Sequence, residues 1–256
     1  LLEPRTTLCK VYWLRRNEPE TMKRASWVVQ PKDYLVGRLS GNPGTTDYSD
    51  ASHAMLLDVR KRSYAYDILA ELGIPESTLP ELHAGTDVIG RLTDDAARVM
   101  GLRSGTPIVA GGGDRACAGI AAGVTVPGDG YCSLGQSAWF TVPGTQPVVD
   151  PGQRIYSIVS STGDTVDCYG TIRSAGHTVD WAERTFGSPN ATTVTQALRS
   201  GTPGSQGLSV LPYIRPERWP EWQVTARGVV FGITDEHTTI DLLRATAEGV
   251  GYAMRR

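Results

Sequence analysis

Apolar positions in the first half of the chain recur at helical spacing, separated by short extended runs. Between residues 63 and 75, Ile68, Leu69 and Leu72 fall on one helical face, and Gly73 follows them as a helix-ending residue. This pattern predicts a short amphipathic helix with one buried face.

A helix, a strand and another helix are expected between residues 92 and 123. Thr93 is placed as the N-cap of the first helix and Gly101 as its end. The apolar run before Gly111–Gly113 is interpreted as a short buried strand, and the alanine-rich run after it as a helix that ends at Gly123. A strand, a glycine turn and a helix form the building step of an α/β domain, so we expect an α/β fold.

The second half begins with strand patterns rather than helices. Residues 130–142 predict a hairpin that turns at Gly135, and residues 154–172 predict a second hairpin that turns at Gly163. Because the change starts near residue 125, we place a domain boundary there. The expected domains cover residues 1–125 and 126–256.

Helical spacing returns after the hairpins. Val179 and Ala182 are expected to face inward from a helix that ends at Gly187. A last helix is predicted from apolar residues at helical intervals, which are Ile240, Leu243, Ala247 and Val250. Because no initiator methionine begins the chain and no stop signal closes this helix, we expect a piece of a longer protein.

Composition and charge narrow the classes of function. Apolar residues make up 40% of the chain and charged residues 20%, which is usual for a globular protein. The 25 basic and 27 acidic residues leave a net charge of −2 spread along the chain. Nucleic acids and anionic membranes require clustered basic charge, and no apolar run is long enough to cross a bilayer. We therefore expect a cytoplasmic protein with no nucleic-acid or membrane partner.

The residues that most often bind metals show no ligand-like spacing. The cysteines form no C-x-x-C pair, so reduced thiols packed as small hydrophobic groups are favoured over zinc or a disulfide framework. They are Cys9, Cys117, Cys132 and Cys168, and the histidines are His53, His83, His177 and His237. The chain also lacks the phosphate-loop, H-E-x-x-H, G-x-S-x-G and G-x-G-x-x-G motifs, which makes metal hydrolases and Rossmann dehydrogenases poor candidates. No residue is assigned to a metal.

Asp114 is the most informative single residue, because it directly follows Gly111–Gly113 between a strand and a helix. An aspartate there could cap the helix. It could also present a reactive carboxylate at a cleft. Local composition leaves both interpretations open.

Eight segments along the chain are informative as an ordered set. They are KVYWLRRNEPE, KDYLVGRLSG, TTDYSDAS, DVIGRLTDDAARVMGLRSGTPIVAGGGD, CSLGQSAWF, IRSAGHTVDW, PERWPEW and RGVVFGITDEHTTIDLLRATAEG. Taken in this order, they resemble the FGGY family of carbohydrate kinases. The resemblance implies an incomplete actin/hexokinase-like (ribonuclease H-like) two-lobed fold of the α/β class. Residues 1–125 would be the later part of a sugar-binding lobe, and residues 126–256 the early part of a nucleotide-binding lobe.

The resemblance also implies a reaction. It is the ATP-dependent, Mg²⁺-assisted phosphorylation of a sugar hydroxyl on a pentulose such as xylulose, or on a related polyol, because the spacing around TTDYSDAS is most similar to xylulokinases. Asp114 would be the general base, and Arg115 beside it would contact the substrate where relatives carry glutamine or asparagine. Since both ends of the family pattern are missing, no phosphoryl transfer is expected from these residues alone. The alternative is a non-catalytic sugar- or nucleotide-binding relative, and a homodimer is left open.

The resemblance implies nucleotide contacts in two short segments. Gly135, Gln136 and Ser137 match a turn that approaches the ATP phosphates, and bunched backbone amides suit an anion. Gly176 and Asp180 match residues beside the nucleotide. An ordinary hairpin turn and a helix start with a solvent-facing acid are the alternatives, and Gln136 and His177 depart from the family pattern.

Other polar and aromatic residues are given structural roles. Turn and cap chemistry is favoured over sugar binding for the cluster Asp47, Ser49, Asp50 and Ser52. An ion pair is expected between Glu217 and Arg218, and core positions for Tyr12, Trp13 and Trp27.

Overall fold

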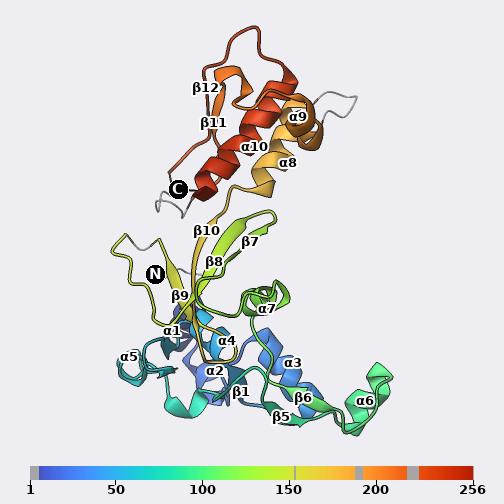
Figure 1. The fold of residues 1–256 in the computed structure, drawn as a ribbon. Helices are drawn as coiled ribbons and strands as arrows, with labels where there is room; N and C mark the ends of the chain where they lie inside the picture. The colour runs from blue at the N-terminus through green and yellow to red at the C-terminus, as the bar shows by residue number, and fades with distance from the viewer. Residues whose placement is uncertain (1–5, 153, 188–192, 218–224, 256) are drawn as a thin grey trace. The chain divides into compact units, whose positions relative to one another are not determined.

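A computed structural model describes residues 6–152, 154–187, 193–217 and 225–255 (Figure 1). The chain forms two compact units. The first contains Leu1–Asp129, Val142–Val148 and Ser157–Cys168, and the second contains Gly130–Thr141, Val149–Tyr156 and Tyr169–Arg256. The chain therefore passes from one unit to the other at several positions after residue 129. The single boundary near residue 125 remains a prediction.

Short helices and strands are interspersed in the first half of the chain, and the second half begins with four strands. The helices are α1 (Thr7–Asn17), α2 (Pro19–Arg24), α3 (Pro31–Ser40), α4 (Tyr48–His53), α5 (Tyr66–Glu71), α6 (Asp94–Met100), α7 (Asp114–Ala121), α8 (Gly176–Phe186), α9 (Val194–Ser200) and α10 (Thr239–Arg255). The strands are β1 (Thr45–Asp47), β2 (Leu57–Asp58), β3 (Ser63–Tyr64), β4 (Glu81–His83), β5 (Val88–Arg91), β6 (Pro107–Val109), β7 (Tyr131–Leu134), β8 (Ala138–Gly144), β9 (Tyr156–Val159), β10 (Val166–Ile172), β11 (Ser209–Leu211) and β12 (Val229–Phe231).

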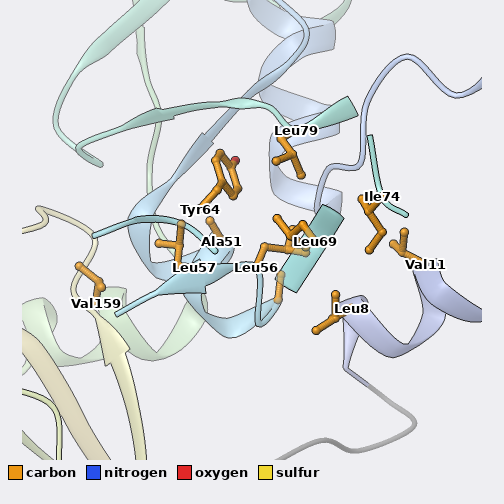
Figure 2. Close-up of a cluster of buried hydrophobic side chains, with 11 residues drawn as sticks. Leu8, Val11, Ala51, Leu56, Leu57, Tyr64, Leu69, Ile74, Leu79 and Val159 are labelled. Carbon is orange, nitrogen blue, oxygen red and sulfur yellow. The ribbon is translucent and has the colours of Figure 1, made fainter. Parts of the chain in front are cut away.

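The first unit is built around the parallel pair β1 and β4, in which Asp47 lies opposite His83. Its buried cluster joins α1, α4, α5 and the segment between α4 and α5 with residues that follow α5 and with one residue of β9 (Figure 2). The cluster contains Leu8, Val11, Ala51, Ala54, Leu56, Leu57, Tyr64, Leu69, Ile74, Leu79 and Val159. The Tyr64 hydroxyl satisfies its hydrogen bond inside this core by donating to the Pro80 carbonyl at 2.6 Å. This packing fixes α4 and the end of β1 in place.

A four-stranded sheet has the strand order β7-β8-β10-β9. The two expected hairpins form its pairs β7–β8 and β9–β10, with Leu134 opposite Ala138 at the first turn and Gly163 at positive φ in the second. Both hairpin predictions are confirmed.

The second unit packs its helices around α10. Ala182 of α8 and Leu243 of α10 are fully buried in one cluster, and Val250 of α10 is buried in another. The expected inward faces of α8 and α10 are confirmed, as is the end of α8 at Gly187. Within the described residues, no helix has both the length and the apolar character needed to cross a bilayer.

Local signals in the first unit also predict its short helices. Helix α6 begins after the N-cap Thr93, whose hydroxyl accepts a hydrogen bond from the Ala96 amide at 3.3 Å, and it ends at Gly101 in the left-handed conformation. Helix α5 forms where expected, but only Leu69 is fully buried, whereas Ile68 is 55% exposed.

Several burial predictions are wrong. Strand β6 is not buried, since Val109 is exposed and the strand pairs with β5 alone among the described strands. Trp13 is 55% exposed rather than a core residue, because α1 buries its opposite face. Trp27, which follows α2, is 41% exposed. The expected packing is wrong for two of the four free cysteines, since Cys117 and Cys132 are exposed residues.

Candidate active site

Asp114 is the first residue of α7, which directly follows the glycine run after β6. Gly113 occupies the N-cap position, so the capping interpretation of Asp114 is wrong. The Asp114 carboxylate is exposed and accepts one hydrogen bond, from the Arg115 amide at 2.7 Å. A carboxylate at a helix N-terminus is favoured as the anion, because the first amides of the helix point toward it. The side chain is therefore available to a molecule outside the protein.

The three glycines before Asp114 each meet a different constraint. Gly111 has φ of +78°, which favours a residue without Cβ. A Cβ on Gly112 would lie 2.9 Å from the Cβ of Ser161, and a Cβ on Gly113 would lie 3.0 Å from an oxygen of Asp50. The glycines thus allow this loop to pack directly on neighbouring side chains of the same unit.

A lysine and three carboxylates lie beneath this loop. The Lys32 ammonium is 2.6 Å from Asp33, 3.1 Å from Asp47 and 3.5 Å from Asp50. It also donates to the Ala110 carbonyl at 2.9 Å, at the start of the glycine run. Burial alone would lower the pKa of Lys32, but the hydrogen bond to Asp33 and the nearby negative charges outweigh it and raise the pKa. Lys32 is therefore a fixed cation within this cluster.

The oxygens of the three carboxylates lie within 4.8 Å of one another, a spacing that would suit a metal ion. The Lys32 ammonium already approaches each of these side chains and supplies the positive charge. Asp33 also accepts hydrogen bonds from the Thr46 hydroxyl at 2.8 Å and from the Gln30 amide at 3.0 Å. We assign no metal to this cluster.

The polar residues of TTDYSDAS cap a helix and also form hydrogen bonds to residues far away in the sequence. Asp47 is fully buried and caps α4 by accepting the Ser49 amide at 2.8 Å and the Ser49 hydroxyl at 2.5 Å, as the cap interpretation expects. Beyond that interpretation, the Ser49 oxygen accepts the Gly113 amide at 2.9 Å. The Ser52 oxygen similarly accepts the Val159 amide at 3.1 Å. Two serines of α4 therefore bind backbone far away in the sequence.

The carboxyl group of Asp50 has a raised pKa. Burial and the charge of Asp47 raise its pKa to about 6, against the opposing effect of Lys32. In the unfolded chain this carboxyl ionises near 3.8, so the folded state binds the extra proton between those two pH values. The stabilisation from Asp50 is thus complete below the lower value and is lost as the pH rises through about 6.

This linkage predicts a pH-dependent effect of Asp50→Asn. We expect the variant to gain thermal stability relative to the parent as the pH rises from 4 to 8, because asparagine cannot ionise. Melting temperatures of both proteins across that range measure the difference. A constant difference across the range would contradict the raised pKa.

The guanidinium of Arg115 acts on another carboxylate of the same unit. Burial raises the pKa of Asp167, and the charge of Arg115 partly offsets that rise. The Nε and Nη1 atoms of Arg115 are themselves buried. The structure therefore directs at least part of this side chain into the protein, toward β10.

In the second unit, the five residues expected to contact a nucleotide are brought together. The Gln136 amide donates to the Asp180 carboxylate at 2.7 Å and its oxygen lies 3.3 Å from Nδ1 of His177. Gly176 lies directly on the turn, since a Cβ there would collide with the Gly135 carbonyl oxygen. The turn between β7 and β8 and the first residues of α8 thus form one cluster.

Many backbone amides of this cluster already have acceptors within it. Gly176 donates to the Gly135 carbonyl at 2.9 Å, and His177 donates to the Gln136 carbonyl at 3.0 Å. The Gly135 amide donates to the Ser137 carbonyl at 2.9 Å. The bunched amides expected from the sequence are therefore partly used to join the turn to α8.

Two neighbouring groups complete the electrostatics of the second unit. Burial and the charges of Arg215 and Arg184 lower the pKa of His177, against the effect of Asp180, so its ring is neutral near pH 7. Glu217 is buried and accepts the amides of Arg173 and Ser174, at 2.8 and 3.2 Å. Its expected partner Arg218 lies outside the described residues.

Comparison with known proteins decides the family. Residues 1–121 match the N-terminal domain of the FGGY family of carbohydrate kinases, and residues 130–256 match its C-terminal domain. The chain belongs to the FGGY family. Its predicted fold class is confirmed, since it matches half of a two-lobed actin/hexokinase-like fold.

Named relatives of this FGGY chain are xylulose kinases. The chain is 32% identical to the xylulose kinase of Escherichia coli K12, over 99% of its own length and 52% of that protein. It is 31% identical to the xylulose kinase of Bacillus subtilis 168, over 97% of its length and 50% of that protein. The crystal structure of xylulose kinase from Rhodospirillum rubrum aligns with a TM-score of 0.86 and 27% identity, covering 99% of this chain and 51% of that one. The chain thus spans about half the length of these relatives.

Sequence reasoning missed Lys32 and Asp33 as members of the candidate site. The segment KDYLVGRLSG contributes to the resemblance, but it offers no local sign of a role for its first two residues. A signal was nevertheless present. Two further aspartates, Asp47 and Asp50, stand three residues apart at the end of β1 and in α4, and buried carboxylates need a positively charged partner.

Proposed function

We propose that the full-length protein containing this chain transfers a phosphoryl group from ATP to a hydroxyl of a pentulose such as xylulose, or of a related polyol. The observation that carries the proposal is the Asp114 carboxylate, which is exposed at the N-terminus of α7 and held on a tightly packed glycine loop. The named xylulose kinases among its relatives support the substrate class.

Asp114 acts as the general base in this proposal. Its carboxylate accepts the proton of the sugar hydroxyl while the hydroxyl oxygen attacks the γ-phosphorus, the bond to the ADP oxygen breaks, and ADP leaves. Phosphoryl transfer asks for little covalent help from the protein, so positioning and charge determine the rate. The first amides of α7 point toward the carboxylate, which must be an anion to accept a proton.

The nucleotide is assigned to the second unit. The nucleotide-binding residues are Gly135, Gln136, Ser137, Gly176 and Asp180. Gly135, Gly176, Asp180 and the Gln136 side chain are bonded within the cluster, so we place the phosphate contacts at the backbone amides of Gln136 and Ser137. Magnesium would neutralise charge on the ATP phosphates, and no residue described here is assigned to it.

The alternative is a relative that binds sugar or nucleotide without transfer. One observation favours it, namely that Gln136 is held by Asp180 and His177 rather than turned outward. The two functions differ in sugar-dependent release of ADP, which accompanies transfer to the sugar and which binding alone does not produce.

A panel of ketoses and polyols tests the proposal. The full-length protein with ATP and Mg²⁺ should release ADP only when a sugar is present, and fastest with a ketopentose. A coupled assay follows ADP, and calorimetry follows sugar and ATP binding. Binding without sugar-dependent ADP release would replace the kinase assignment with the binding alternative.

A further inference from the structure

The loop that carries Asp114 is held at both ends by side chains from elsewhere in the first unit. Lys32 of α3 donates to the Ala110 carbonyl at 2.9 Å, before the glycines. Ser49 of α4 accepts the Gly113 amide at 2.9 Å, after them. These contacts join residues 78 and 64 positions apart in the sequence.

The loop depends on such contacts, because its own residues restrict it little. Glycine has no side chain to limit φ and ψ, and it loses more conformational freedom on ordering than any other residue. Backbone bonds give partial support, since Gly111 donates to the Gly85 carbonyl at 2.9 Å. At Gly113, the residue before the base, the described acceptor is the Ser49 hydroxyl.

The Ser49 hydroxyl has a fixed orientation. It donates its proton to Asp47, and a hydroxyl with its proton engaged turns its lone pairs toward other donors. Asp47 is in turn fully buried and lies 3.1 Å from the Lys32 ammonium. One connected set of charges and hydrogen bonds therefore fixes both ends of the loop.

We propose that Ser49 and Lys32 are positioning residues for Asp114, acting through the backbone of Gly113 and Ala110. The inference rests on the proposed function, in which Asp114 takes the proton of the sugar. A base displaced by a fraction of an ångström from the attacking hydroxyl loses much of its effect, because reacting atoms must approach in a narrow geometry. Ser49 and Lys32 need not touch the substrate.

The chain offers a matched control in Ser52, which lies on the same helix. Both serines are buried, at 2% and 5% exposure, and both accept a distant backbone amide, at 2.9 and 3.1 Å. Ser52 binds the Val159 amide, which is not part of the glycine loop. Replacing either serine by alanine removes one hydrogen bond to a distant amide. Ser49→Ala also removes the bond to Asp47, and it alone removes a bond to the loop.

The experiment compares Ser49→Ala and Ser52→Ala in the full-length protein. We expect a decrease in melting temperature for both, larger for Ser49→Ala because it also loses the bond to Asp47. We expect a decrease in kcat on the order of 10- to 100-fold for Ser49→Ala alone, and little change in the KM for ATP. Hydrogen exchange should become faster at the Gly113 amide in Ser49→Ala and at the Val159 amide in Ser52→Ala. Ser49→Cys, which nearly keeps the volume but offers only a weak acceptor, should behave like Ser49→Ala.

Two results would overturn the proposal. One is an equal kcat for the two alanine variants despite faster exchange at Gly113, and the other is unchanged exchange at Gly113 in both Ser49 variants. Failure of the proposed function would be a separate result. Full turnover in an Asp114 variant would show that Asp114 is not the base, and the hydrogen exchange measured in the Ser49 and Ser52 variants would not change.

Discussion

Replacing Asp114 by asparagine in the full-length protein will lower kcat by about 10²- to 10⁴-fold, the usual contribution of a positioned general base. Asparagine has nearly the same shape, and its oxygen can still accept the Arg115 amide, so α7 should start at the same residue. It cannot take up the proton of the attacking hydroxyl. Steady-state kinetics with ATP and the preferred sugar measure the loss, and calorimetry should show ATP binding unchanged.

The control for this variant is Asp94→Asn. Asp94 is also an exposed aspartate at the first position of a short helix, α6, in the same unit. Its carboxylate accepts a hydrogen bond from the Ser104 hydroxyl. This variant should keep the parent kcat, so comparable losses at Asp94 and Asp114 would show a general effect of helix-terminal charge and not base catalysis.

Local sequence signals predicted those elements whose ends are determined by their own residues. Thr93 and Gly101 define α6 through a side-chain cap and a left-handed glycine, both of which act within a few residues. The hairpin turn at Gly135 is equally local. In contrast, the exposure of Trp13 depends on which face of α1 packs with residues of α4 and α5. The residues of α1 alone do not predict which face that is.

The candidate site shows the same division. Asp114 could be identified because a glycine run before an aspartate is visible in one stretch of sequence. The contacts of Lys32 with Asp47 and Ala110 could not, because they form only when α3, β1 and the loop before α7 are brought together. Sequence favoured cap chemistry for Asp47 and Ser49, and the structure shows that the cap also holds the Gly113 amide.

Replacing one of two glycines on α10 by alanine should lower the stability of the second unit, and replacing the other should raise it. Gly249 is buried against β11, where a Cβ would lie 3.1 Å from the carbonyl carbon of Val210 and closer still to its oxygen. Since both are backbone atoms, relief requires a shift of the helix or the strand. We expect Gly249→Ala to destabilise the second unit by about 1–3 kcal/mol, as overpacked cores do.

Gly251 lies two residues further along the same helix, and a Cβ there would meet nothing within 4 Å. Alanine is favoured over glycine in a helix by up to about 1 kcal/mol, so Gly251→Ala should raise the melting temperature. Because the two substitutions have the same intrinsic helix preference, their difference isolates the contact between α10 and Val210. Thermal unfolding of both variants measures it, and stabilisation by Gly249→Ala would mean that α10 does not pack on β11 in solution as it does here.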